Sequence, residues 1–314
     1  MISLGFGVLE FSFFLLLSLN SIKGFLIQQI ICIFAIQNRQ SFISRFNFDM
    51  NRVIMLGTGN ATVTQCYNTC FILETSTTKL LVDAGGGNGV LAQLKKVGVG
   101  IADIHHLFIT HAHTDHVLGV IWVIRMVAQC KGYKGKLHVY SHDKVMIVVK
   151  TIIGMILAKK QLEKVAQRVE FHELKDGDSF GVGDIQMTCF DIHSTKEKQF
   201  GFRAELPSGQ LLACLGDEPY NALNRCYVEK ADWLMCEAFC LYADRDVFRP
   251  YEKCHSTALD AGKLAAQLDV RNLILYHTEE KTLSTRRTTY TQEAAANFHG
   301  RIIVPDDLEE IMLD

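Results

Sequence analysis

Four side chains that commonly bind metal ions, those of His111, His113, Asp115 and His116, lie within six positions of the sequence. They follow a short apolar segment, residues 106–110, that predicts a β-strand. No regular helix or strand would turn all four the same way, but a loop at a strand end can, and such loops often carry active sites. Imidazole nitrogens and carboxylate oxygens suit Zn²⁺, with Mn²⁺ or Fe as alternatives. The motif therefore predicts a metal centre, and a solvated polar loop is the weaker interpretation.

Further ligands must come from other parts of the chain, because one loop cannot complete the shells of two metal ions. Three candidates each follow an apolar, strand-like segment: His193, Asp217 and His277. Taken singly, a histidine after a strand is more often a structural hydrogen-bonding group, and Asp217 could be a turn residue. Their joint recurrence at strand ends favours one shared site at the rim of a sheet.

The elements that must position these residues alternate between strands and helices from residue 52 onward. Predicted strands cover residues 52–56, 69–74, 79–83, 106–110, 185–192, 199–206, 210–215, 272–276 and 301–304. Predicted helices cover residues 89–97, 117–129, 258–268 and 286–298, and residues 137–171 predict a strand, an apolar helix, a basic helix and a strand. No low-complexity linker divides residues 50–314, so we expect one domain with two sheets covered by outer helices.

Composition places the chain among ordinary globular proteins. Of its 314 residues, 48% are hydrophobic and 21% charged, and the formal net charge is -2. A protein whose main work is to bind nucleic acid usually carries a basic excess, so RNA is neither supported nor excluded as a partner. The ten cysteines are scattered and show no paired metal-binding spacing. Reduced, mostly buried thiols in this number indicate a reducing, cytoplasmic location.

Residues 1–49 differ from the rest of the chain. Between residues 1 and 37 only Glu10 and Lys23 are charged, and the longest apolar segments are short for a membrane span. Three interpretations remain open: a signal or anchor, a hairpin at a membrane surface, and an upstream extension from a wrongly chosen start codon. Met50 directly precedes the first predicted strand, which favours a start-site artefact or a cleaved segment. Membrane contact or export would depend on this extension alone.

The order of the motifs resembles the metallo-β-lactamase superfamily. The sequence His-x-His-x-Asp-His at 111–116 is followed by His193, by Gly216-Asp217 and by His277. The motif His255-Ser-Thr-Ala258 before a predicted helix resembles a motif of the ribonuclease Z-like branch. Members of this branch include tRNA 3′-processing endoribonucleases. The resemblance spans residues 51–278. It implies an α/β fold, a four-layer αββα sandwich with metals at one sheet edge, and a homodimer.

The resemblance also implies a role for each ligand. One Zn²⁺ would be held by His111, His113 and His193, a second by Asp115, His116 and His277, and Asp217 would bridge them. Such a pair, about 3.5–4 Å apart, can activate a shared water and stabilise a phosphodiester transition state. Asp115 would orient or deprotonate the attacking water, and His255 would be the general acid for the leaving alkoxide. The alternative for His255 is a structural role beside the helix-capping Ser256.

Several features depart from the ribonuclease Z pattern. No Gly-x-Pro element of a protruding RNA-binding arm is found, and residues 150–168 predict ordinary helix. His277 is followed by Thr278-Glu-Glu-Lys281 and His193 by Ser-Thr-Lys-Glu-Lys198, where the family usually has other residues. These differences leave the metal chemistry intact and indicate a subgroup with its own substrate.

Three hypotheses follow. The first is a zinc-dependent phosphodiesterase that resembles ribonuclease Z and processes tRNA 3′ ends. The second is a hydrolase of a small cyclic phosphodiester, ester or lactone, which the acidic pI and the missing arm favour. The third is a non-catalytic scaffold or a di-iron redox protein. A scaffold should have lost ligands, and redox relatives typically carry Glu where this chain has His113.

Overall fold

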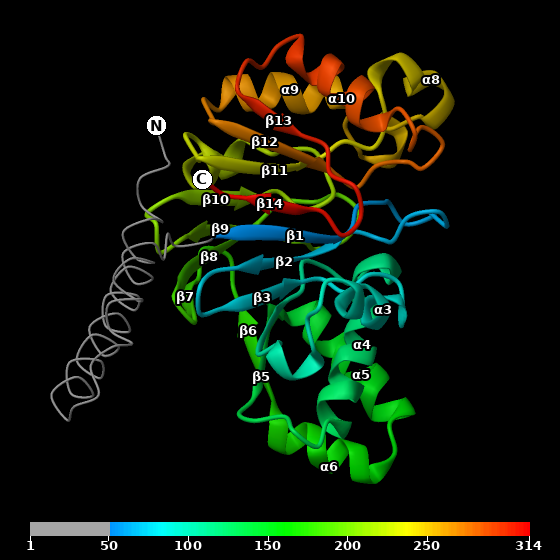
Figure 1. The fold of residues 1–314 in the computed structure, drawn as a ribbon, viewed down its shortest axis with the longest axis vertical. Coiled ribbons are helices and arrows are strands. Elements are labelled where there is room, and N and C mark those ends of the chain that lie inside the picture. Colours follow the sequence, from blue (N-terminus) through cyan, green and yellow to red (C-terminus); the bar gives the residue numbers. More distant parts are fainter. Residues whose placement is uncertain (1–50) are drawn as a thin grey trace, which may run out of the picture. The chain divides into compact units, whose positions relative to one another are not determined.

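Two β-sheets lie against each other in the structure, a computed structural model that describes residues 51–314 (Figure 1). The first sheet has the strand order β14-β1-β2-β3-β4-β5-β6, and the second has the order β13-β12-β11-β10-β9-β8-β7. The strands of the first are β1 (Arg52–Gly57), β2 (Cys70–Glu74), β3 (Lys79–Val82), β4 (His106–Phe108), β5 (Leu137–His142), β6 (Val169–Leu174) and β14 (Glu310–Met312). Those of the second are β7 (Ser179–Val182), β8 (Ile185–Asp191), β9 (Phe200–Glu205), β10 (Leu211–Cys214), β11 (Trp233–Glu237), β12 (Asn272–Tyr276) and β13 (Arg301–Ile303).

Helices cover the outer face of each sheet (Figure 1). The helices on the first sheet are α3 (Gly89–Lys96), α4 (Thr114–Gln129), α5 (Asp143–Ile156) and α6 (Lys159–Arg168). The second sheet is covered by α9 (Ala258–Gln267) and α10 (Arg286–Ala295), and the short helices α7 (Arg225–Val228) and α8 (Arg245–Phe248) lie in its connections. This arrangement confirms the predicted four-layer αββα sandwich.

Three apolar layers hold the four structural layers together. Strand β1 illustrates how the sequence builds them, because its side chains alternate between the two faces of the sheet. Val53 and Met55 are buried between the two sheets, whereas Ile54 and Leu56 are buried under the helices of the first sheet. A third layer, which includes Leu273 and Leu275 of β12, separates the second sheet from α9 and α10.

Parallel strands in both sheets determine where the predicted ligands meet. Strands β3 to β6 are mutually parallel, and so are β10 to β13. Residues that follow the carboxyl ends of parallel strands emerge at one edge of the sheet, which is where open α/β sheets bind ligands. His111 follows β4, Asp217 follows β10, and His277 directly follows β12.

The predicted elements correspond closely to the observed ones, with two differences. Helix α4 begins at Thr114 rather than at residue 117, so Asp115 and His116 lie in its first turn and not in a loop as expected. Strands β7, β11 and β14 were not predicted, although Trp233–Glu237 of β11 is fully buried.

The predicted extension at residues 1–49 lies outside the described residues, and the alternatives for it stay predictions. Among the helices of residues 51–314, none has both the length and the apolar character needed to cross a membrane.

Candidate metal centre

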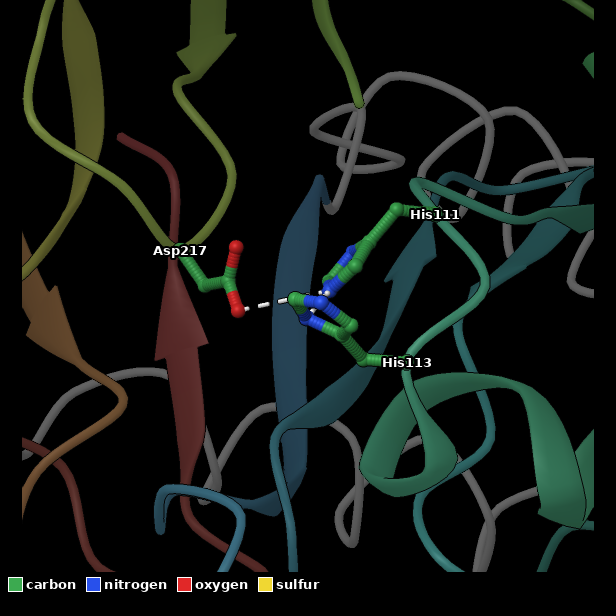
Figure 2. Close-up of side chains that lie close together, drawn as sticks. All are labelled: His111, His113 and Asp217. Carbon is green, nitrogen blue, oxygen red and sulfur yellow. Dashed lines mark hydrogen bonds and ion pairs between the residues drawn. The ribbon is translucent and has the colours of Figure 1, made fainter. Parts of the chain in front are cut away.

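Two groups of potential ligands lie at the shared edge of the sheets. The first group consists of His111, His113 and Asp217. Figure 2 shows the two imidazoles approaching from the segment after β4, while the Asp217 carboxylate faces them from the loop after β10. His111 Nε2 lies 2.8 Å from His113 Nδ1 and 3.4 Å from Asp217 Oδ2. The first sheet and the second sheet therefore both contribute to this group.

The second group consists of Asp115, His116 and His277, all of them buried. Asp115 Oδ2 lies 3.3 Å from His116 Nε2 and 3.7 Å from His277 Nε2. The first two residues come from the first turn of α4, and His277 comes from the end of β12.

Asp217 connects the two groups. Its Oδ2 atom lies 3.5 Å from His116 Nε2 and 3.7 Å from His277 Nε2, in addition to its contact with His111. Burial alone would raise the pKa of the Asp217 carboxyl, but His111 and His116 hold that pKa well below its usual range. A charged carboxylate between two ligand groups is the arrangement that a bridging ligand requires.

The hydrogen bonding and protonation of the histidine ring nitrogens fit the binding of metal ions. His116 Nε2 and both ring nitrogens of His277 are buried and have no hydrogen-bond partner, a state that is costly for polar atoms that bind nothing. Burial lowers the pKa of the His277 imidazole to about 3, so this ring is neutral at physiological pH. Neutral imidazole is the form that ligates metals. Buried ring nitrogens that converge on carboxylate oxygens and have no hydrogen-bond partner fit a site that could hold cations.

Asp83, which the sequence analysis missed, orients the ligands of the first sheet. Its Oδ2 accepts hydrogen bonds from His116 Nδ1 at 2.7 Å and from Thr110 Oγ1 at 2.7 Å, and its Oδ1 accepts from the Thr110 N–H at 2.8 Å. A donor bond from His116 Nδ1 fixes the tautomer in which Nε2 is free to bind a metal. Helix α4 is held close by, since a Cβ built on Gly119 would lie 1.8 Å from Ala84 O.

Two further buried residues from the second sheet support the site. Gln199 donates a hydrogen bond from Nε2 to Asp217 Oδ1 and accepts one at 3.1 Å from the Asp217 N–H. Glu237, the last residue of β11, accepts a hydrogen bond of 2.7 Å from Ser256 Oγ and lies with Oε2 3.7 Å from His255 Nδ1. Glu237 therefore lies beside the predicted general acid, at a distance too long for a hydrogen bond.

His255 faces a cavity of about 500 Å³ beside the ligands. Its ring stacks on Phe239 with centroids 4.7 Å apart and lies 5.4 Å from the His277 ring. Lys196 and Lys253 also line the cavity. Lys196 Nζ donates to the Lys253 carbonyl at 2.8 Å and lies 3.6 Å from Glu218 Oε1, which holds the ammonium group near the opening.

His193 differs from the other predicted ligands. Its side chain is exposed, and it belongs to neither ligand group found among the described residues. Its backbone is left-handed, with φ 59°, a conformation also found at Asp83 (φ 55°) and His277 (φ 59°). The role of His193 as a ligand of the first ion stays a prediction.

Comparisons with known proteins agree with the fold. A metallo-β-lactamase-fold protein, YhfI from Bacillus subtilis, superposes with a TM-score of 0.67 at 19% identity over 84% of this chain and 100% of that one. The short form of human tRNase Z gives a TM-score of 0.67 at 20% identity over 84% of this chain and 99% of that one. The ribonuclease Z of Thermobifida fusca is 25% identical over 303 residues, which cover 82% of this chain and 93% of that protein. The two solved structures show that the chain has the metallo-β-lactamase fold, and the curated relatives that it resembles are ribonucleases Z.

A match to a family model assigns the chain to a specific family. The model described as "Anti-Pycsar protein Apyc1" matches residues 51–295, so the chain belongs to this family. The match begins at the first residue that the structure describes and includes every residue of the two ligand groups, Asp83 and His255.

Proposed function

We propose that this chain uses two Zn²⁺ ions to hydrolyse a small cyclic phosphodiester. The size of the cavity beside the ligands carries the proposal, because about 500 Å³ is in the range of small-molecule sites and holds a nucleotide-sized ligand. Two lysines at this cavity supply positive charge for one phosphate, and the chain as a whole has a net charge of -2. Neither feature favours a long RNA, whose phosphates need an extended basic surface.

The ligand groups assign a task to each residue. His111, His113 and Asp217 would hold one ion, with His193 as the proposed further ligand, and Asp115, His116 and His277 would hold the other. When bound, such a pair lowers the pKa of a shared water and stabilises the charge of the phosphodiester transition state. Asp115 orients that water, Lys196 and Lys253 bind the phosphate, and His255 donates a proton to the leaving alkoxide.

A substrate panel tests the proposal. The zinc-loaded full chain is incubated with 2′,3′- and 3′,5′-cyclic nucleoside monophosphates, a pre-tRNA, bis(p-nitrophenyl) phosphate, a lactone and a β-lactam. We expect turnover of a cyclic nucleotide and of the chromogenic diester, and little or none of the lactone and β-lactam, which have no phosphate group for Lys196 and Lys253 to bind. Cleavage of pre-tRNA without cleavage of any cyclic nucleotide would refute the small-substrate assignment.

RNA processing is the second candidate, and the names of the ribonuclease Z relatives favour it. The pre-tRNA in the same panel decides between the two. We also propose a cytoplasmic location, which is supported by the free thiols of the nine cysteines in the described part of the chain. A homodimer is proposed from the resemblance alone, and sedimentation of the purified protein tests it.

A further inference from the structure

A third group of potential metal ligands lies far from the catalytic edge, at the last two strands of the first sheet. It consists of His138 on β5 with Glu170 and His172 on β6, and their ligand atoms all lie within 4.8 Å of one another. His138 is near the start of its strand, whereas the catalytic ligands follow the carboxyl ends of strands parallel to it. This group therefore belongs to the opposite end of the sheet and shares no residue with the catalytic centre.

Strand register brings the three side chains together. His138 is the direct partner of Glu170 across the parallel pair β5 and β6, and His172 follows two residues later as the partner of Tyr140. Residues two apart on a strand point to the same face, so both β6 side chains share a face with His138. Tyr140 packs between the two sheets, which places the group on that inner face. The two histidines are half-buried, and the side chain of Glu170 is more exposed.

The two imidazoles are close enough to share an ion. His138 Nδ1 lies 3.0 Å from His172 Nε2, and the rings stack with centroids 5.2 Å apart. Two nitrogens bound to one Zn²⁺ in tetrahedral geometry are roughly 3.4 Å apart, given Zn–N bonds of about 2.1 Å. On the adjacent strand β4, His106 stacks on His138 at 5.5 Å.

The charged neighbours of the group are few. Lys136 Nζ forms an ion pair of 2.9 Å with Glu170 Oε2, but both side chains are largely exposed. Exposed pairs of this kind contribute little to stability, so a cation can displace the ammonium group from the carboxylate. Tyr140 is uncharged, packs between the two sheets and stacks on His172 with ring centroids 4.7 Å apart.

We propose that His138, Glu170 and His172 form a second, non-catalytic metal site that binds Zn²⁺ or a similar transition-metal ion. Two imidazoles and one carboxylate select such ions over Mg²⁺ and Ca²⁺, which prefer oxygen ligands only. Strand β6 is the edge strand of its sheet, so an ion bound across β5 and β6 would stabilise the pairing of β6 with β5.

The zinc content of the full chain tests this site. Wild type and the double variant His138→Ala/His172→Ala are equilibrated with Zn²⁺, freed of unbound metal, and analysed for zinc per chain. We expect the double variant to hold about one ion fewer and to retain wild-type turnover. The matched control is His105→Ala, because His105 lies in the same region but outside the group. Equal zinc content in wild type and double variant overturns the site, and so does an equal loss in His105→Ala.

A measurement on the unsubstituted protein keeps the test valid if the double variant fails to fold. Zn²⁺ is added to ¹⁵N-histidine-labelled wild type after the tighter sites are filled, and the ring nitrogens are followed by NMR. We expect the signals of His138 and His172 to shift together with one added ion, while that of the exposed His299 does not. Unmoved ring signals at both residues would overturn the proposal. The outcome does not depend on whether the catalytic centre hydrolyses any substrate.

Discussion

Replacing Asp83 with asparagine removes the acceptor for the hydrogen bond from His116 Nδ1 and puts a donor in its place. We expect this single change to weaken metal binding. Asp83 accepts hydrogen bonds from His116 Nδ1, Thr110 Oγ1 and the Thr110 N–H, at 2.7, 2.7 and 2.8 Å. Asparagine keeps one oxygen and places an NH₂ group at the other position. With its oxygen toward the fixed backbone N–H, the NH₂ group faces His116 Nδ1, where two donors would meet.

The neutral His116 ring that metal binding requires carries its one proton on Nδ1 in the wild type, whereas in the variant it avoids this conflict only by carrying that proton on Nε2. Nε2 is the atom that faces Asp115 and Asp217, so an incoming cation has to displace the proton before it binds. Loss of such an orienting partner typically lowers metal affinity about 10–100-fold, which is roughly 1.4–2.8 kcal/mol at 25 °C. The left-handed backbone at Asp83 is not the cause of this loss, because asparagine tolerates that conformation.

Competition between metal-free protein and a zinc-binding dye measures the effect. The matched control is Asp269→Asn, because Asp269 is also left-handed, with φ 53°, but is exposed and belongs to neither ligand group. We expect the control to bind zinc as wild type does. A folded Asp83→Asn protein with wild-type zinc affinity would refute the assigned role of this carboxylate.

Three further predictions concern the acid, the metals and a buried cation. His255→Ala should retain its metals and lose about 10²–10⁴-fold in turnover of a diester with an alkoxide leaving group. The loss of turnover on bis(p-nitrophenyl) phosphate should be smaller. Loss of metal in this variant would show that His255 is a ligand. EDTA treatment should abolish turnover and added Zn²⁺ should restore it, whereas full activity of verified metal-free protein would contradict a metal mechanism. Arg286 is buried and donates to Thr58 Oγ1, Thr278 Oγ1 and the Pro305 carbonyl, so urea unfolding of Arg286→Met should show a loss of about 2–4 kcal/mol. Its exposed neighbour Arg287 forms surface ion pairs, so Arg287→Met should lose at most about 1 kcal/mol, and equal losses would argue against the buried network.

The motif ligands could be predicted because their spacing and their positions after apolar strands are visible in the sequence. The start of α4 could not, because His113 occupies the N-cap without a side-chain hydrogen bond, and helix starts are recognised by capping residues. His193 shows the limit of the same pattern. Its position at a strand end was predicted, but the direction of its side chain depends on a left-handed φ that the sequence does not reveal.

The supporting residues were missed for different reasons. Asp83 follows an apolar strand, as the predicted ligands do, so the signal used for them would have found it. Gln199 carries no such signal, and Glu237 ends the apolar strand β11, which was itself not predicted. Each acts through a contact between separate strands or loops, Gln199 with Asp217 and Glu237 with His255. Such pairs become visible only when the second sheet is assembled.

His277 combines a left-handed backbone with two buried ring nitrogens that have no hydrogen-bond partner. A non-glycine residue in that conformation costs about 1–3 kcal/mol, and unsatisfied buried nitrogens add to that cost. In the metal-free chain, glycine at this position would therefore be the more stable choice. Selection of variants for thermal stability alone, without selection for turnover, would therefore favour the loss of a residue that we propose as a metal ligand.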